Sequence, residues 1–344
     1  MNKNQPKNKQ ALSWRRRLII FTSVYTFIWV CVIGIFAFLR LNEARIDFTS
    51  QMDEEIMEMT SRLDTYNDLI YATRAILLHD KDLTIPQWHL YLDSMALEDR
   101  YPDVLAMGYS AAVKTKDLDK YEQYLNNLYS SSKKTFDITP TSEGDNNYIL
   151  TYAHDPILGS NPPLGSNYAI DPTRREIIEK AFASGTSQMT PPLTIIGYDN
   201  TQQIVLLYFP MYIQGKPIDT PTQRLAAAKG VVMLVFTAPS LMQNALFMQE
   251  NETEQIAFSI VDTTDQSNEI LVHESQSMST PNISYKAVID FSGRKWKFTF
   301  HLPIMKLVMQ QRTFLSLALI IAMVLFTITI GHLMVLNFIK KKEK

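Results

Sequence analysis

The chain of 344 residues contains a single cysteine, Cys31, which lies inside a long apolar run. The rest of the chain therefore has no disulfide, structural or catalytic. Six histidines are present, but none stands in a recognised metal-ligand spacing such as H-E-x-x-H. The G-x-S-x-G nucleophile elbow and the phosphate-binding Gly-Lys loop are absent as well. The sequence predicts no enzyme activity, no metal site and no cofactor.

Long apolar runs are confined to the two ends of the chain. Residues 18–39 carry no charge, and residues 313–339 contain only His332 as an ionisable group. A bilayer core about 30 Å thick needs roughly 20 helical residues, so both runs are long enough to span it. A cleaved signal peptide is the alternative for the first run. Its apolar stretch exceeds the usual length of about 7–15 residues and no small-x-small cleavage site follows before Arg40, so we expect an anchor.

Charges beside the two runs predict the topology. The tail 1–17 has six basic residues and no acid, and the tail 340–344 has four lysines and one glutamate. The positive-inside rule then places both tails in the cytoplasm and residues 40–312 outside, in a multi-pass protein of the inner membrane. The total charge of −2 leaves −11 for residues 18–339, which argues against nucleic acid as a partner.

The first outer segment, residues 40–84, is predicted to be a long stalk helix, because no Pro or Gly occurs between Leu41 and Ile85. Apolar residues recur along it at alternating steps of four and three, which is the pattern of a narrow coiled-coil seam. Two interpretations stay open, a homodimer seam and packing of the helix on its own domain. The seam residues are Phe48, Met52, Ile56, Met59, Leu63, Tyr66 and Ile70.

After this helix the chain consists of short apolar runs between Pro, Gly and Asn clusters, which predict strands. The first set covers residues 104–109, 148–152, 204–211 and 230–236, and the second covers 256–262, 270–273, 283–291 and 295–301. Helices are expected at 118–129 and 172–183, the second between an N-cap at Asp171 and a stop at Gly185. Two successive sets of strands with few helices predict an α+β fold with two tandem antiparallel sheets.

Several separated blocks in the middle of the chain match one family in order and spacing. Over roughly residues 95–300 the sequence resembles the CHASE family, the extracytoplasmic sensor domain of bacterial receptors and plant cytokinin receptors. The blocks are residues 101–109, Leu164-Gly165, residues 171–175, Ala181, Gly185, residues 190–192, residues 209–212 and residues 291–296. The resemblance implies a long helix followed by two PAS-like domains, the membrane-distal one at 85–238 with the ligand and the membrane-proximal one at 239–312.

Departures from the family pattern indicate a different ligand. Spacing from Gly185 places Arg174 where plant cytokinin receptors have an aspartate, and Tyr208 where they have a threonine. Asn167 stands where the family usually has a carboxylate. Because an arginine cannot accept the hydrogen bonds of an adenine donor, cytokinin is not expected. A guanidinium beside a helix N-terminus suits a small anion instead.

Alternatives to this ligand site follow from ordinary structural roles. Arg174 has an internal alternative, an ion pair with Asp171 or Glu176. Apolar residues on neighbouring runs are expected as walls of the ligand site, and each has the alternative of a core position. These wall residues are Met107, Ile195, Ile196 and Leu206.

The resemblance also implies an output domain, because CHASE receptors usually continue into a histidine kinase or a cyclase. Only residues 340–344 follow the second apolar run. Either the sequence is a truncated input module, or a separate membrane partner provides the output. We expect a sensor that binds a small molecule and signals through its transmembrane helices. The rival interpretation is a non-sensing membrane scaffold, whose distal pocket would be filled by side chains.

Overall fold

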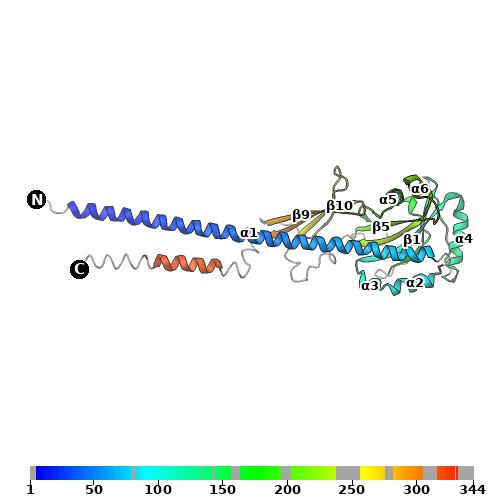
Figure 1. Cartoon of the computed structure of the whole chain (residues 1–344), viewed down its shortest axis with the longest axis horizontal. Helices are drawn as coiled ribbons and strands as arrows, with labels where there is room; N and C mark the ends of the chain where they lie inside the picture. The colour runs from blue at the N-terminus through cyan, green and yellow to red at the C-terminus, as the bar shows by residue number, and fades with distance from the viewer. Residues whose placement is uncertain are drawn as a thin grey trace. The chain divides into compact units, whose positions relative to one another are not determined.

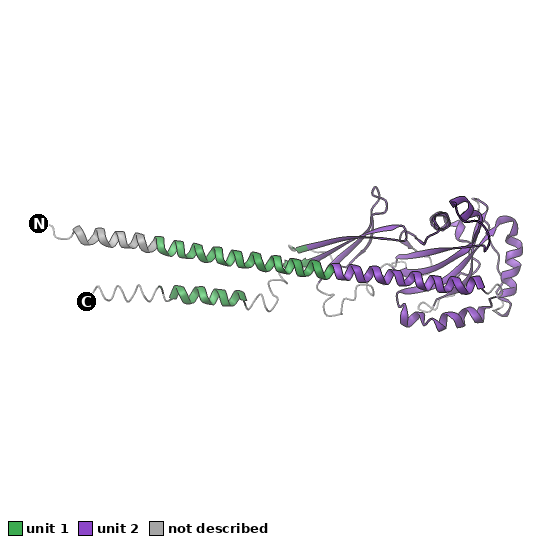
Figure 2. Ribbon diagram, in the orientation of Figure 1, with its two compact units in different colours: residues 1–52, 279–283, 302–344 green, residues 53–278, 284–301 purple. Residues whose placement is uncertain are grey.

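The computed structural model divides into two compact units (Figures 1 and 2). Unit 1 comprises residues 1–52, 279–283 and 302–344, and unit 2 comprises residues 53–278 and 284–301. The structure describes residues 5–79, 83–132, 134–141, 144–155, 163–194, 203–237, 256–275, 282–304, 316–329 and 331.

Unit 1 is helical over most of its described length. It contains the first part of α1, Gln5–His79, and a shorter apolar helix, Ser316–Thr329. Among the described residues, only α1 is long and apolar enough to cross a membrane. Its large apolar side chains, such as Phe21 and Phe27, are exposed, as a lipid-facing helix requires. The second predicted span, 313–339, is described at 316–329 and 331, and its described helix is shorter than a span requires, so two spans remain a prediction.

The long helix ends earlier than the sequence pattern predicted. The predicted stalk reached residue 84, but α1 ends at His79, and α2, Ile85–Ser94, begins a few residues later. The Thr84 side chain accepts a hydrogen bond from the backbone N–H of Gln87, and the Gln87 side chain accepts one from the backbone N–H of Thr84. This capping box, with Pro86 in the first turn, starts a new helix. A third short helix, α3, spans Leu97–Arg100.

The first sheet of unit 2 is six-stranded and antiparallel, with the strand order β2-β1-β6-β5-β3 and with β4 paired to β5. Four of its strands, β1, β2, β5 and β6, coincide with the first predicted set and extend each member by a few residues, whereas the two-residue strands β3 and β4 were not predicted. The six strands are β1 Val104–Lys114, β2 Asn146–His154, β3 Gln188–Met189, β4 Leu193–Thr194, β5 Gln203–Tyr212 and β6 Ala228–Thr237. Burial is nearly continuous along β5 and β6, because both faces of this sheet are covered.

Two helices cover opposite faces of the first sheet. On one face α5, Pro172–Ser184, packs Phe182 into a core with Tyr208 and Met233. On the other face α1 packs Tyr66 against Phe236, with ring centroids 4.9 Å apart. The hydroxyl of Tyr66 donates a short hydrogen bond to the buried carboxylate of Asp103. Residues 233 and 236 reach different faces because side chains alternate along a strand.

The seam on α1 is used within the chain. In unit 2, Met59, Leu63, Tyr66 and Ile70 are all buried in the single chain, with at most 2% of each side chain exposed. This agrees with packing of the helix on its own domain, the second of the two interpretations of the pattern. These four side chains are not available as a seam between two chains.

The remaining helices of unit 2 follow from local signals. The Asp171 carboxylate caps α5 by accepting a hydrogen bond of 3.0 Å from the backbone N–H of Arg174, and Gly185 ends the helix at φ +80°. A capping box at Thr220 starts α6. The other helical segments are α4 Leu118–Leu128, α6 Pro221–Ala226, η1 Thr115–Asp117, η2 Ser130–Ser132 and η3 Tyr168–Ile170.

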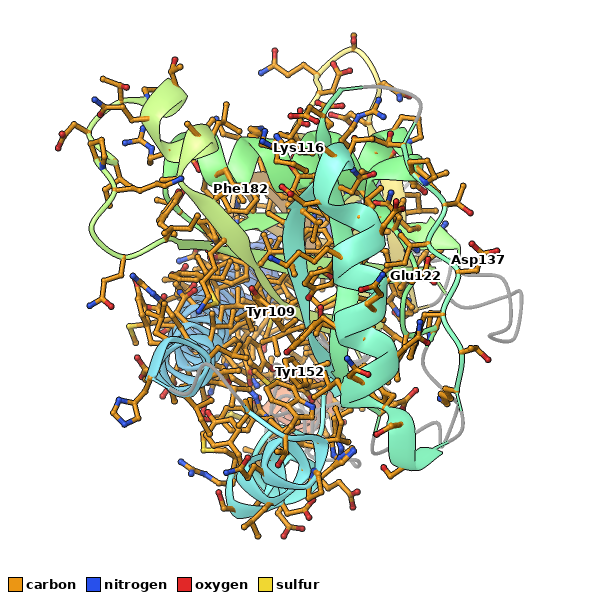
Figure 3. The ribbon with its side chains drawn as sticks, turned by 90° about the vertical axis from the view of Figure 1, so that its right-hand side faces the viewer. Tyr109, Lys116, Glu122, Asp137, Tyr152 and Phe182 are labelled. Carbon is orange, nitrogen blue, oxygen red and sulfur yellow. The ribbon has the colours of Figure 1, made fainter. Side chains whose placement is uncertain are left out.

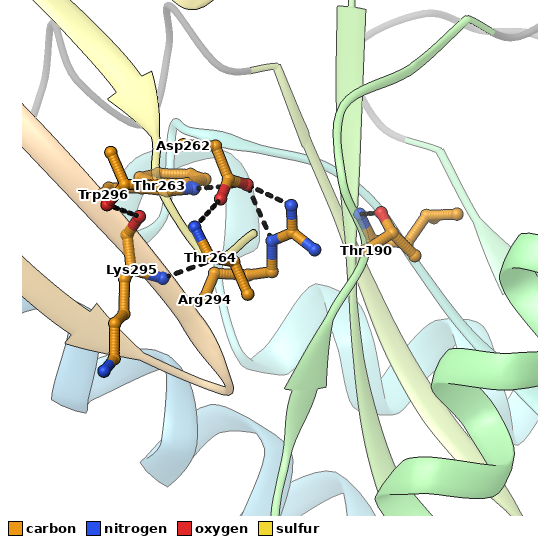
Figure 4. A network of polar contacts seen from close by, with 8 residues as sticks. Thr190, Asp262, Thr263, Thr264, Arg294, Lys295 and Trp296 are labelled. Atoms are coloured by element: carbon orange, nitrogen blue, oxygen red, sulfur yellow. Dashed lines mark hydrogen bonds and ion pairs between the residues drawn. The ribbon is translucent and has the colours of Figure 1, made fainter. Parts of the chain in front are cut away.

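The second sheet has four strands in the order β8-β7-β10-β9, and these match the second predicted set. A buried ion pair joins Asp262, the last residue of β7, to Arg294, the first residue of β10, and Trp296 donates to the same carboxylate at 3.3 Å (Figure 4). The sheet supplies the second half of an α+β fold with a long N-terminal helix and two antiparallel sheets, which confirms the predicted class at that level. The strands are β7 Ala257–Asp262, β8 Ile270–Glu274, β9 Asn282–Phe291 and β10 Arg294–Pro303.

The turn between β9 and β10 contacts the first sheet. The backbone N–H of Met189 donates to the carbonyl of Ser292 at 2.8 Å, and the hydroxyls of Ser187 and Ser292 lie 2.9 Å apart. Gly293 lies against the side chain of Gln188, with no room for a Cβ atom. The start of β3 and the tip of this hairpin therefore form one packed junction.

Candidate functional site

The predicted site is centred on the first turn of α5. Arg174 is half-buried there, and its guanidinium lies over the ring of Tyr168, 4.9 Å from the ring centroid. Its Nε atom is buried and has no hydrogen-bond partner among the described residues. Arg174 also lines a cavity of about 550 Å³, together with residues 135–137 and 163–168. A positive charge with an unused donor therefore lies at the edge of a cavity.

Tyr208 lies on β5 in the core beneath α5, close enough to Arg174 for the guanidinium charge to act on its phenol. Its side chain is fully buried, and its hydroxyl has no hydrogen-bond partner among the described residues. Burial is the main cause that raises the pKa of Tyr208 well above its ordinary value; Tyr168 adds to this and the positive charge of Arg174 opposes it. The phenol is therefore neutral at physiological pH and keeps its proton for donation.

Arg174 and Tyr208 are thus brought together by the fold, although 34 positions separate them in the sequence. Each has one buried polar atom without a partner, and such an atom costs about 1–3 kcal/mol of stability. An N–H donor of a guanidinium and a phenolic O–H are both satisfied by an oxygen acceptor. A carboxylate or phosphate oxygen that reached both atoms would form charge-assisted hydrogen bonds in a poorly hydrated place.

The internal alternative for Arg174 was an ion pair with a neighbouring acid. No ion pair joins Arg174 to Asp171 or Glu176 in this part of the structure, although all three residues are described. The Asp171 carboxylate instead accepts from the backbone N–H of Arg174, as a helix cap. The next residue, Arg175, donates to the carbonyl of Ala169 at 3.0 Å and so holds the loop before α5. Of the two adjacent arginines, Arg174 is the one that lines the cavity.

Asn167 also lines the cavity, but its amide is committed to the protein. Its Oδ1 atom accepts from the backbone N–H groups of Tyr148 and Ala169, each at 3.0 Å. Its Nδ2 atom donates to the carbonyl of Thr139 at 3.0 Å and to the side chain of Asn147 at 2.7 Å. These four bonds use the whole capacity of an amide, so Asn167 shapes the cavity wall and has no donor to spare.

The two predicted wall residues that the structure describes, Leu206 and Met107, lie on opposite faces of the first sheet. Leu206 lies two positions before Tyr208 on the same face of β5 and belongs to the core beneath α5. Met107 lies on the opposite face of the sheet, where its sulfur accepts from the hydroxyl of Thr73 on α1 at 3.8 Å. The prediction that Met107 forms a wall of the ligand site is therefore wrong, because its side chain faces α1. Ile195 and Ile196 lie outside the described residues.

Sequence reasoning missed two parts of the site. Tyr168, whose ring lies under Arg174, was not selected, and neither was the loop of residues 135–139 across the cavity. A tyrosine six positions before an arginine carries no recognised signal, and the loop is distant in sequence. Among the described residues there is no group of three or more His, Cys, Asp or Glu side chains that could hold a metal ion.

A comparison with family models agrees with the family predicted from the sequence. The family model of the CHASE domain matches residues 81–273, more than half of the chain. The crystal structure of the periplasmic sensory domain of the Campylobacter jejuni chemoreceptor Tlp1 is similar to this chain with a TM-score of 0.44 and 6% sequence identity. That similarity covers 76% of this chain and 94% of the Tlp1 domain. No curated protein matches the chain.

Proposed function

This chain belongs to the CHASE-domain family, and on that premise we propose that it is an extracytoplasmic sensor that binds a small anion between Arg174 and Tyr208. One observation supports this proposal more than any other. The Nε atom of Arg174, which lines the cavity, and the hydroxyl of Tyr208, whose phenol is affected by the charge of Arg174, are both buried without a partner among the described residues. A ligand oxygen would satisfy both atoms at once.

The experiment is a thermal-shift screen of the detergent-solubilised chain against small carboxylates and phosphates, with matched neutral amides. A hit at 100 times its dissociation constant adds about 2.7 kcal/mol of stability, because it binds only the folded state. Cytokinins are included and are expected to give no shift.

Two variants test the residues. Arg174→Ala removes the charge and is expected to weaken binding of the best hit by at least about tenfold, since a hydrogen bond to a charged group contributes about 1.5–3 kcal/mol. Tyr208→Phe removes only the hydroxyl, so it should weaken binding without lowering the stability of the ligand-free protein. Lys180→Ala, an exposed change on the same helix, is the control. Unchanged affinity in Arg174→Ala for every hit would refute the anion role.

The alternative function is a membrane scaffold that senses nothing. In that case the same screen yields no ligand that depends on Arg174. The cavity beside Arg174, about 550 Å³ in volume, favours the sensor, because a scaffold has no reason to leave such a space unfilled.

Further parts of the proposal concern topology and signalling. We propose that both termini lie in the cytoplasm, that two transmembrane helices anchor a homodimer, and that a kinase or cyclase, fused or separate, reads the signal. No catalytic activity is proposed for this chain. The apolar window of α1 and the basic tail before it support the anchor and its orientation.

A further inference from the structure

A second cavity lies on the other face of the first sheet, between β1, β2, α4 and the end of α1. It has a volume of about 670 Å³, which is within the usual range of small-molecule sites. Tyr109 and Tyr152 form part of its wall, beside α4 and away from Phe182 of the core beneath α5 (Figure 3). Met107, which contacts α1, projects from the same face of β1 as Tyr109. This cavity is therefore separate from the one at Arg174.

The tyrosine wall is rigid, because neighbouring groups hold each hydroxyl. Tyr109 donates to the carbonyl of Lys229 at 3.1 Å, and Tyr152 donates to the carbonyl of Leu83 at 2.7 Å. The Tyr121 hydroxyl lies 2.6 Å from that of Thr151. Burial raises the pKa of all three tyrosines, so they stay neutral. With the hydroxyls occupied, the cavity presents mainly ring carbon to a ligand.

Small residues line the cavity as well. Ala111 on β1, Ala226 at the end of α6 and Ala228 on β6 all line the cavity. A strand position that faces a core usually holds a larger side chain, and protein interiors leave few voids larger than a water molecule. A larger side chain at Ala111, which is buried on β1, would take up part of this space.

Charge at the cavity is mainly positive. Four lysines and one acid, Asp117, line it. Lys114 is paired with Asp145 at 3.3 Å, and the ammonium group of Lys229 donates to the carbonyl of Leu77 at 2.7 Å. The ammonium groups of Lys120 and Lys216, both exposed, have no hydrogen-bond or ion-pair partner in the part of the chain that the structure describes.

We propose that this cavity is a second ligand site, which takes an aromatic carboxylate with its ring against Tyr109 and Tyr152 and its anion at Lys120 and Lys216. Aromatic rings prefer offset or edge contacts with other rings, and the fixed tyrosines offer such faces without further ordering. The two lysines supply an attraction that a neutral aromatic molecule lacks.

The test is calorimetric titration of the full chain in detergent with benzoate and indole-3-carboxylate. Indole-3-carboxamide serves as the neutral probe and hexanoate as the aliphatic acid. Saturable binding of the aromatic acids at millimolar concentration is expected, with weaker binding of both comparison probes. Hexanoate or the carboxamide binding as tightly as the aromatic acids would overturn the assignment, as would the absence of any saturable binding.

Variants locate the binding. Ala111→Leu should fill the cavity and abolish binding in a protein that still melts cooperatively. The double change Lys120→Gln and Lys216→Gln, at exposed positions that do not affect folding, should weaken binding about tenfold, and Lys116→Gln, exposed but outside the cavity, should not. Unchanged binding in both Ala111→Leu and the double variant would refute the site.

Arg174→Ala separates this site from the proposed sensor site. Binding of the aromatic acids should be unchanged in Arg174→Ala, because that residue lies on the other face of the sheet. Loss of binding in Arg174→Ala would place the acids at the first site and refute the second, whatever the result of the screen at Arg174.

Discussion

Replacing Gly293 by alanine tests the junction between the two sheets. Gly293 has φ +79°, a conformation that costs a non-glycine residue about 1–2 kcal/mol. A Cβ atom built there would lie 2.2 Å from the Oε1 atom of Gln188, so the glutamine must move. Its amide would then lose its hydrogen bonds to Ser184 and Thr186, worth about 1 kcal/mol. The expected total destabilisation is about 2–3 kcal/mol.

A matched control separates the two contributions. Gly215 has φ +83°, but a Cβ atom there meets nothing within 4 Å. Gly215→Ala should therefore cost only the backbone part, about 1–2 kcal/mol. Gln188→Ala removes the obstacle beside Gly293, so the double variant should be more stable than the sum of the single changes predicts, by about 1 kcal/mol.

Thermal unfolding of the detergent-solubilised chain measures these differences. A change of 1 kcal/mol shifts the melting temperature of a domain of this size by about 2–4 °C. Gly293→Ala is thus expected to melt clearly below Gly215→Ala. Equal melting temperatures for the two alanine variants, together with an additive double-mutant cycle, would show that the turn of β9 and β10 does not contact Gln188.

Three further predictions concern the whole chain. The fragment 40–311 should fold with mixed α/β signal and should not unfold on addition of chelator or reductant, since its core contains neither disulfide nor recognised metal spacing. Burial lowers the pKa of His154, so the unfolded state binds more protons near pH 6.5. Stability should fall as the pH drops through that value, and the fall should be less steep in His154→Gln. If a dimer forms, a single cysteine in place of Met57, which is 68% exposed, should crosslink in an otherwise cysteine-free chain, and a cysteine in place of buried Met59 should not. Crosslinking at position 59 and not at 57 would show that the seam is a dimer contact.

Much of the fold was predictable from local sequence signals. All eight predicted strands and the two predicted helices that follow the stalk are present, because alternation, caps and breakers act over a few residues. The helix from Pro172 illustrates this, since its N-cap Asp171 and its terminal Gly185 are both visible in the sequence. The end of α1 was predictable as well. Thr84 and Gln87 have the spacing of a capping box, which marks the start of a new helix and therefore the end of the one before it.

Long-range features were not predictable in the same way. The seam on α1 has the same spacing whether it packs on a sheet or on a second chain, so the pattern alone left both open. Met107 was placed on the wrong face because β1 is buried on both sides, which removes the alternation that would orient it. The tyrosine cavity depends on residues from β1, α4 and β2, which no local spacing brings together.

The unpartnered atoms at Arg174 and Tyr208 connect stability with the proposed function. A protein selected only for stability would replace Tyr208 by phenylalanine, because a buried hydroxyl without a partner costs about 1–3 kcal/mol. If a ligand oxygen accepts from that hydroxyl, the same free energy is recovered on binding. It then adds to the difference in the ligand's affinity between a conformation that offers the hydroxyl and one that does not. Only such a difference in affinity can shift a conformational equilibrium. Tyr208→Phe should therefore raise the melting temperature of the empty protein and reduce the shift that a bound anion produces. A variant that lost stability without ligand would show that the hydroxyl has a partner in the folded chain, and the argument for an anion at this site would lose its basis.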